Sequence, residues 1–183
     1  MLFRSLNVGR ASIWLFDKNR LAISLIDLYE HGTYHQSPDI TLKVADYAHY
    51  FRALAGEEHA ISAHNALSDP RTRDFSETYL RPLRIGAMLY APIRQKGRVV
   101  GVLCAEHIGE RRRWSPYETH LTSSLATMAT LALEYAERRE VEHALRIAKD
   151  AAEVASQAKS EFLASRSEEH TSELQSHHDL VCR

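Results

Sequence analysis

Alternating and continuous runs of apolar residues predict strands in the first half of the chain. Segments 10–16 and 21–29 are rich in β-branched and aromatic residues and are separated by a polar turn, so they predict a β-hairpin. Segments 87–93 and 99–107 predict a second hairpin around Gly97. Both strands of the second hairpin carry apolar residues at successive as well as alternate positions. This pattern is typical of a sheet that is buried on both faces.

Shorter elements are predicted between the two hairpins. Asp46 is placed to cap a short helix that carries three aromatic residues and ends at Gly56. Segment 59–63 reads as a short third strand. His31 and His35 are four residues apart, as metal ligands on a helix are, but Gly32 lies between them. We therefore expect both histidines in a solvated loop, with no metal site.

The second half of the chain predicts one long helix. Ser115-Pro-Tyr-Glu118 has the pattern of a capping box with proline at the first helical position. Because no glycine or proline occurs after Pro116, we expect a continuous helix from 116 to 164. A first apolar set with 4-3-4-3 spacing comprises Leu121, Leu125, Met128, Ala132 and Tyr135. A second set, one residue out of register, comprises Val141, Leu145, Ala148, Ala152, Ala155 and Phe162.

The second set, which we call the seam, predicts a weak parallel homodimer, because alanine-rich seams allow close approach but bury little area. A single long surface helix is the alternative. From Arg166 to Arg183 this spacing is absent, and three of the eleven histidines occur there. We therefore expect 166–183 not to continue the helix pattern.

Composition narrows the class of protein. The net charge is −1 with 23 basic and 24 acidic residues, which gives no global field for gathering nucleic acid. No apolar run is long enough to span a bilayer and no secretory leader opens the chain, so we expect a cytoplasmic protein. Cys104 lacks an adjacent histidine and is expected to be a packed core thiol. We find no carboxylate dyad, nucleophile triad or phosphate loop, and therefore expect no catalytic residues in this chain.

Several fragments taken together resemble the GAF domain of bacterial sensor proteins, from Leu6 to about Glu134. They are Ser12–Phe16, Ser68–Arg73, Tyr79–Leu83, Ala91–Ile93, Gly97–Leu103, Trp114 and Leu125-Ala126. The resemblance implies an α+β fold, a GAF-like antiparallel sheet of five or six strands flanked by helices and followed by a long signalling helix. It also implies a pocket for an unknown small molecule under a lid, and no cofactor is required. Polar side chains that could reach this pocket are His64, Tyr79, Tyr90 and His107.

A second resemblance concerns the segment after the GAF-like region. Ala158–Ala164 is similar to the entry of the dimerisation helix of a sensor histidine kinase, although Glu168 stands where that family has its phosphoacceptor histidine. The resemblance implies an ATP-dependent parent kinase that phosphorylates a response regulator. The alternatives are a regulatory domain of a diguanylate cyclase and, less favoured, a sulfoxide reductase.

The end of the chain resembles something other than a protein family. Arg166–Ser176 is similar to the translation of a sequencing-library adapter, so we expect the natural continuation after Ser165 to differ. We also expect a helix that family members carry before the first strand to precede Met1. The predicted organisation is a sensory domain over 1–134, a coiled-coil signalling helix over 135–165 and, as the adapter resemblance implies, a non-native tail over 166–183.

Overall fold

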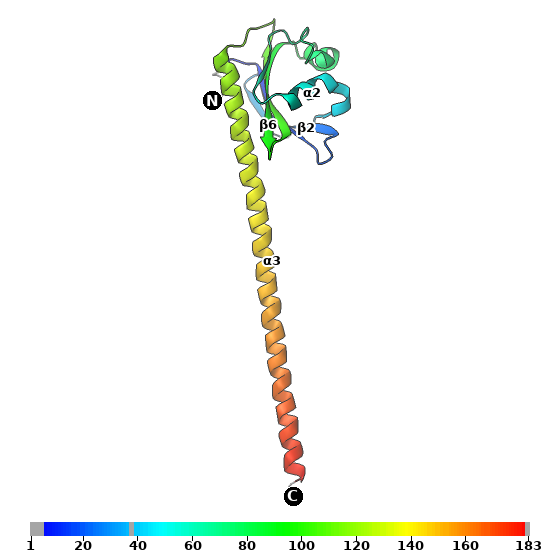
Figure 1. Cartoon of the computed structure of the whole chain (residues 1–183), viewed down its shortest axis with the longest axis vertical. Helices are drawn as coiled ribbons and strands as arrows, with labels where there is room; N and C mark the ends of the chain where they lie inside the picture. The colour runs from blue at the N-terminus through cyan, green and yellow to red at the C-terminus, as the bar shows by residue number, and fades with distance from the viewer. Residues whose placement is uncertain (1–5, 37–38, 182–183) are drawn as a thin grey trace. The chain divides into compact units, whose positions relative to one another are not determined.

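The structure of this protein is a computed structural model that describes residues 6–36 and 39–181, with side chains as far as Ser160. The chain divides into two units, Met1–Glu134 and Tyr135–Arg183, and each is described by itself. The first unit contains a sheet with helical segments on both faces, and the second contains only helix. Figure 1 shows the sheet of the first unit with helix α2 (Ala48–Gly56) on one side.

The sheet is antiparallel throughout, as predicted, and has seven strands within the described residues. The strand order is β3-β2-β1-β7-β6-β5, and β4 pairs with β2 beside β3. The strands are β1 (Arg10–Phe16), β2 (Ala22–Glu30), β3 (Thr33–Gln36), β4 (Thr41–Lys43), β5 (Ile61–Ala63), β6 (Ile85–Gln95) and β7 (Arg98–Ile108). Both predicted hairpins and the short third strand are therefore confirmed.

The expectation of a loop around the two early histidines is wrong. His31 and Gly32 have φ of 48° and 86° and form a tight turn, from which β3 pairs back onto β2. Left-handed backbone at two successive residues is the geometry of a hairpin turn, so Gly32 reverses the chain here instead of ending the pairing. His31 lies in this turn and His35 lies on β3.

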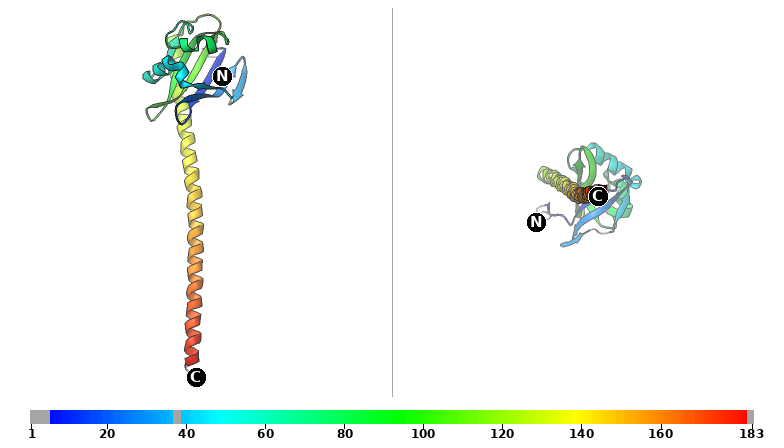
Figure 2. Two further views of the ribbon diagram at one scale, coloured as in Figure 1. Left: turned by 90° about the vertical axis from the view of Figure 1, so that its right-hand side faces the viewer. Right: turned by 90° about the horizontal axis from the view of Figure 1, so that it is seen from below.

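Two layers cover the sheet. On one face lie η1 (Val44–Tyr47), α2, η2 (Arg73–Phe75) and η3 (Ser76–Leu80), which together we call the lid. η3 is a π-helical turn, in which the backbone N–H of Arg81 donates to the carbonyl of Ser76 at 3.0 Å. On the other face lie the first turns of α3 (Pro116–Val181), whose Ala126 packs against the sheet. Figure 2 shows the sheet and the lid from two further sides.

The lid helix begins differently from the sequence expectation. Asp46 lies inside the 3-10 turn η1 instead of capping α2, because η1 starts two residues earlier, at Val44. The backbone N–H of His49 in α2 donates instead to a carboxylate oxygen of Asp74, at 3.0 Å. A side chain from η2 thus satisfies the start of α2, a tertiary cap that local sequence does not reveal.

Helix α3 starts as predicted and ends later. Ser115 and Glu118 form the capping box, with Ser115 N–H donating to Glu118 Oε2 at 2.8 Å and Glu118 N–H donating to Ser115 Oγ at 3.3 Å. The helix is continuous to Val181, beyond the expected end at Ala164, since no helix-breaking residue interrupts it. Among the described residues, no helix is long and apolar enough to cross a bilayer.

The seam residues are exposed within the second unit. Val141 is 62% exposed and Leu145 is 68% exposed. The three alanines of the seam are also exposed, whereas the side chain of Phe162 lies outside the described ones. The homodimer that this seam predicts is not tested by a single chain, and it stays a prediction.

Candidate functional site

A small cavity lies between the sheet and the lid, and we call it the lid cavity. Strands β1, β2, β6 and β7 supply its floor, and α2, η2 and η3 supply its roof. The volume is about 20 Å³, which is room for about one water molecule. The residues that line it are Trp14, Ile23, Leu42, Tyr50, Phe51, Phe75, Tyr79, Met88, Val102, Cys104 and Glu106. Most of these walls are apolar or aromatic, so the few polar atoms decide what the cavity can recognise.

One buried carboxyl group, Glu106 on β7, carries the polar chemistry of the cavity. Its Oε2 accepts a hydrogen bond from Arg10 Nε at 2.9 Å, and its Oε1 accepts one from the Tyr79 hydroxyl at 2.9 Å. Arg10 is only 4% exposed and forms a second ion pair with Glu30. Tyr79 lies on η3, so this cluster ties the lid to strands β1, β2 and β7.

Burial and the charge of the partner shift the pKa values of Glu106 and Arg10 in opposite directions. Burial raises the pKa of the Glu106 carboxyl, and the positive charge of Arg10 offsets part of that effect. Burial is the largest effect on Arg10 and works against its charge, but the interactions with Glu106 and Tyr79 together outweigh it and raise the pKa of the guanidinium. Burial also raises the pKa of the Tyr79 hydroxyl well above its usual range. The phenol therefore stays protonated at neutral pH and acts as a donor to Glu106.

Cys104 is a packed core thiol, as predicted. It is 3% exposed, and its Sγ lies 3.6 Å from the hydroxyl of Tyr50. Burial raises the pKa of this thiol to about 12. Because a nucleophilic cysteine requires the thiolate, a group in this state is unreactive near neutral pH.

The four residues expected to contact a ligand are not brought together. Tyr79 lines the lid cavity, and Tyr90 is fully buried beside it, with its ring centroid 4.6 Å from that of Tyr50. The hydroxyl of Tyr90 has no hydrogen-bond partner among the described residues. His64 and His107 do not line this cavity. His107 is on the same strand as Glu106 but one position on, so its side chain leaves the opposite face of the sheet.

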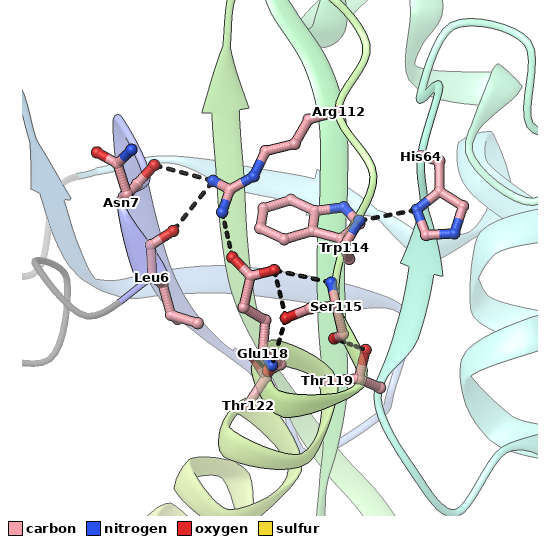
Figure 3. Close-up of polar contacts among 9 residues, drawn as sticks. All are labelled: Leu6, Asn7, His64, Arg112, Trp114, Ser115, Glu118, Thr119 and Thr122. Atoms are coloured by element: carbon pink, nitrogen blue, oxygen red, sulfur yellow. Dashed lines mark hydrogen bonds and ion pairs between the residues drawn. The ribbon is translucent and has the colours of Figure 1, made fainter.

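His64 belongs to a polar joint at the start of α3, shown in Figure 3. Its Nδ1 accepts a hydrogen bond from the backbone N–H of Trp114 at 3.1 Å. The guanidinium of Arg112 pairs with Glu118 of the capping box and donates to the carbonyl oxygens of Leu6 and Asn7, at 3.0 and 2.9 Å. The same guanidinium lies 4.4 Å above the Trp114 ring. These contacts tie the residues before α3 to β5 and to the segment before β1, so the joint fixes where α3 begins.

A larger groove lies on the helix face of the sheet. It has a volume of about 320 Å³ and runs between strands β1, β2 and β7 and the α3 residues Leu125, Met128, Ala129 and Ala132. Its walls are largely apolar, and its rim carries Asp27, which pairs with the hydroxyl of Tyr34. No buried charge among the described residues is aimed into it, so the lid cavity with Glu106 is the better candidate for specific recognition.

Sequence reasoning missed the residues that dominate the site. The local pattern places Arg10 and Glu106 only as members of strands, although a charged residue within an otherwise apolar strand is itself a signal of a buried pair. Arg112 stands in a run of three arginines, a pattern typical of a solvated loop, yet it is half-buried in the joint. Among the described residues, no group of three or more His, Cys, Asp or Glu could hold a metal ion.

Solved structures with the same fold are numerous. The blue-light-absorbing form of the PixJ GAF domain from Thermosynechococcus elongatus has a TM-score of 0.62 and 20% identity, over 78% of this chain and 84% of that one. The GAF domain of an Acinetobacter phosphoenolpyruvate-protein phosphotransferase has a TM-score of 0.59 and 16% identity, over 75% and 78% of the two chains. At these identities the likeness establishes the fold alone.

A bacteriophytochrome chromophore-binding domain from R. palustris has a TM-score of 0.58 and 12% identity, over 76% of this chain and 53% of that one. A search of curated proteins found no match.

The family model described as GAF domain matches residues 1–133. This match spans the sheet, the lid, the polar joint and the first turns of α3. The chain therefore belongs to the GAF domain family, which consists of sensory and regulatory modules.

Proposed function

We propose that this chain is the cytoplasmic input module of a two-component sensor histidine kinase, and that a small molecule bound in the lid cavity is its signal. The observation that carries the proposal is the alternation along β7. Cys104 and Glu106 line the cavity on one face of this strand. Leu103 and Ala105, their immediate neighbours, pack on the other face in the clusters that include Ala126 and Trp114.

This arrangement supports transmission of a conformational change from the lid cavity through the sheet to the start of α3. A ligand that displaces the Tyr79 hydroxyl from Glu106 changes the position of β7, and the same strand forms the surface on which α3 begins. Packed interiors respond to such a shift by changing between discrete arrangements. The ligand acts as a signal to the extent that it binds one arrangement more tightly than the other.

The long helix α3 would carry the change from the sensory domain to the output domain. Val141 and Leu145 are exposed large apolar residues at a spacing suited to a parallel helix pair. We propose that two copies pair through this seam and pass the change in α3 to a kinase core, which uses ATP and a response regulator. Lys159-Ser-Glu-Phe-Leu163 favours the kinase over a diguanylate cyclase as the output. Sequencing the genomic locus beyond codon 165 separates them, since His-Glu-Arg-Thr-Pro supports the kinase and Gly-Gly-Asp-Glu-Phe the cyclase.

One of the similar solved structures, a far-red-absorbing domain, has bound biliverdin. A tetrapyrrole is far larger than the 20 Å³ of the lid cavity, so we propose a smaller ligand for this chain. A thermal-shift screen of the full chain tests the ligand role, with nucleotides, haem, biliverdin and small polar metabolites as probes. A probe that raises the melting temperature must lose its effect in Val102→Phe, which fills the cavity. The control Leu131→Phe changes an exposed residue and must keep the effect.

A further inference from the structure

The aromatic residues around the lid cavity have an arrangement of their own. Five of the eleven lining residues are aromatic, from β1, α2, η2 and η3. Their rings stand at steep angles to one another. The Tyr50 and Phe75 rings meet at 89° with centroids 4.9 Å apart, and the Tyr50 and Phe51 rings meet at 83° with centroids 5.2 Å apart. In these edge-to-face contacts the rings already touch one another, so a cation reaches their negative faces when the lid is displaced.

The charge at the lid cavity is negative, which suits a cation. Glu106 lines it, whereas no described Lys, Arg or His does. Arg10 pairs with Glu106 from outside the lining and is shared with a second carboxylate, Glu30, so the ion-paired cluster holds two carboxylates and one guanidinium. Burial raises the pKa values of Cys104, Tyr50 and Tyr79, so these neighbours are neutral near pH 7 and add no opposing charge. An anion entering the cavity would meet a buried carboxylate, and a cation would gain from it.

The roof of the cavity is built to move more easily than its floor. It includes a 3-10 turn and a π-helical turn, which are short elements with poorer hydrogen-bond geometry than an α-helix. The hydroxyl of Tyr79 joins this roof to Glu106. A cation that pairs with Glu106 therefore competes for the same carboxylate that holds the lid. Because about 20 Å³ is free, any ligand larger than water enters with displacement of the lid.

From these three observations we propose that the lid cavity binds a small organic cation of the alkylammonium class, held between the aromatic rings and Glu106. The inference rests on the proposed role of the cavity as the ligand site and specifies the chemical class of its ligand. Aromatic cages closed by a carboxylate suit quaternary and alkylated ammonium groups, which are weakly hydrated and spread their charge over a large surface.

Three probes of nearly the same shape test the charge preference. They are choline, its uncharged isostere 3,3-dimethylbutan-1-ol, and the anion 3,3-dimethylbutanoate, each titrated into the ¹⁵N-labelled full chain at fixed ionic strength. The indole N–H of Trp14 reports on the cavity, and that of Trp114, in the cluster on the other face of the sheet, reports whether binding reaches the surface on which α3 begins. Trp114→Phe assigns the two signals. We expect choline to shift the Trp14 signal with an affinity about tenfold higher than the alcohol, the factor that one cation–π contact supplies, and the anion to have no effect.

Two variants test the residues, with a matched control. Glu106→Gln should lower the choline affinity without lowering that of the alcohol, whereas Glu77→Gln, which removes an exposed carboxylate of η3 that does not line the cavity, should leave both affinities unchanged. Should Glu106→Gln not fold, Phe75→Leu replaces one aromatic wall with an apolar side chain and should lower the choline affinity more than the alcohol affinity.

The outcomes separate this inference from the proposed function. Equal affinity for choline and the alcohol overturns the cation class and leaves the cavity as a ligand site. Binding of the anion in preference to choline also overturns it. If none of the three probes moves the Trp14 signal while another compound stabilises the chain in the thermal-shift screen, the cation class is wrong and the ligand role stands. If choline shifts Trp114 and not Trp14, the effect does not arise in the cavity and the inference is wrong.

Discussion

The hydroxyl of Tyr79 should be the most important single atom joining the lid to the sheet. It donates to Glu106 at 2.9 Å and accepts from Arg10 at 3.4 Å. Tyr79→Phe keeps the ring and removes only these bonds, which leaves Glu106 Oε1 without its donor. A hydrogen bond to a buried charged group is worth about 1.5–3 kcal/mol, and we expect a loss of about 2 kcal/mol in the free energy of unfolding. For a domain of this size that corresponds to a fall in Tm of roughly 6–10 °C.

Thermal unfolding of the full chain, followed by circular dichroism in the near ultraviolet, measures this effect in the sheet domain. Tyr34→Phe is the matched control, because its hydroxyl also donates to a carboxylate, that of Asp27, but the residue is 59% exposed. An exposed pair contributes about 0–1 kcal/mol, so the control should change Tm by only a few degrees. Equal shifts for the two variants, or no shift for Tyr79→Phe, would refute the reasoning that Tyr79 anchors the lid.

The seam, the core thiol and the helix cap each support one further prediction. Leu145→Glu should weaken self-association at least about tenfold without unfolding the sheet domain, because each buried Leu contributes about 1.5–3 kcal/mol to a helix pair. Sedimentation velocity over a range of concentrations measures the self-association. Because the pKa of the Cys104 thiol is about 12, a thiol reagent at pH 8 should modify Cys104 only after the domain unfolds, and the rate of modification should increase with pH. The reaction is measured in a Cys182→Ser chain, in which Cys104 is the sole thiol. Ser115→Ala removes the cap of α3 and should lower stability by about 1 kcal/mol, measured by urea unfolding, whereas Ser124→Ala should not.

Local sequence was sufficient for much of the fold. The two hairpins, the double-sided burial of β6 and β7 and the capping box at Ser115 follow from residue types at short spacing. In each case the interacting residues are near neighbours in the chain or on one hairpin, so their pattern is visible without the fold. The resemblance to the GAF domain also rested on short fragments, and the match over residues 1–133 confirms it.

The candidate site was decided by tertiary structure. Arg10 and Glu106 are 96 residues apart in the chain, and they meet because β1 and β7 are adjacent in the sheet, with these two residues opposite each other in the register. The cap that Asp74 supplies to α2 and the contacts of Arg112 with the chain near Leu6 likewise join distant segments. A single sequence carries residue types and local spacing, but pairings between distant segments are set by strand order and register, which depend on the packing of the whole core. For this reason the sequence predicted a pocket under a lid, and only the structure identified the buried carboxylate that gives it a chemical preference.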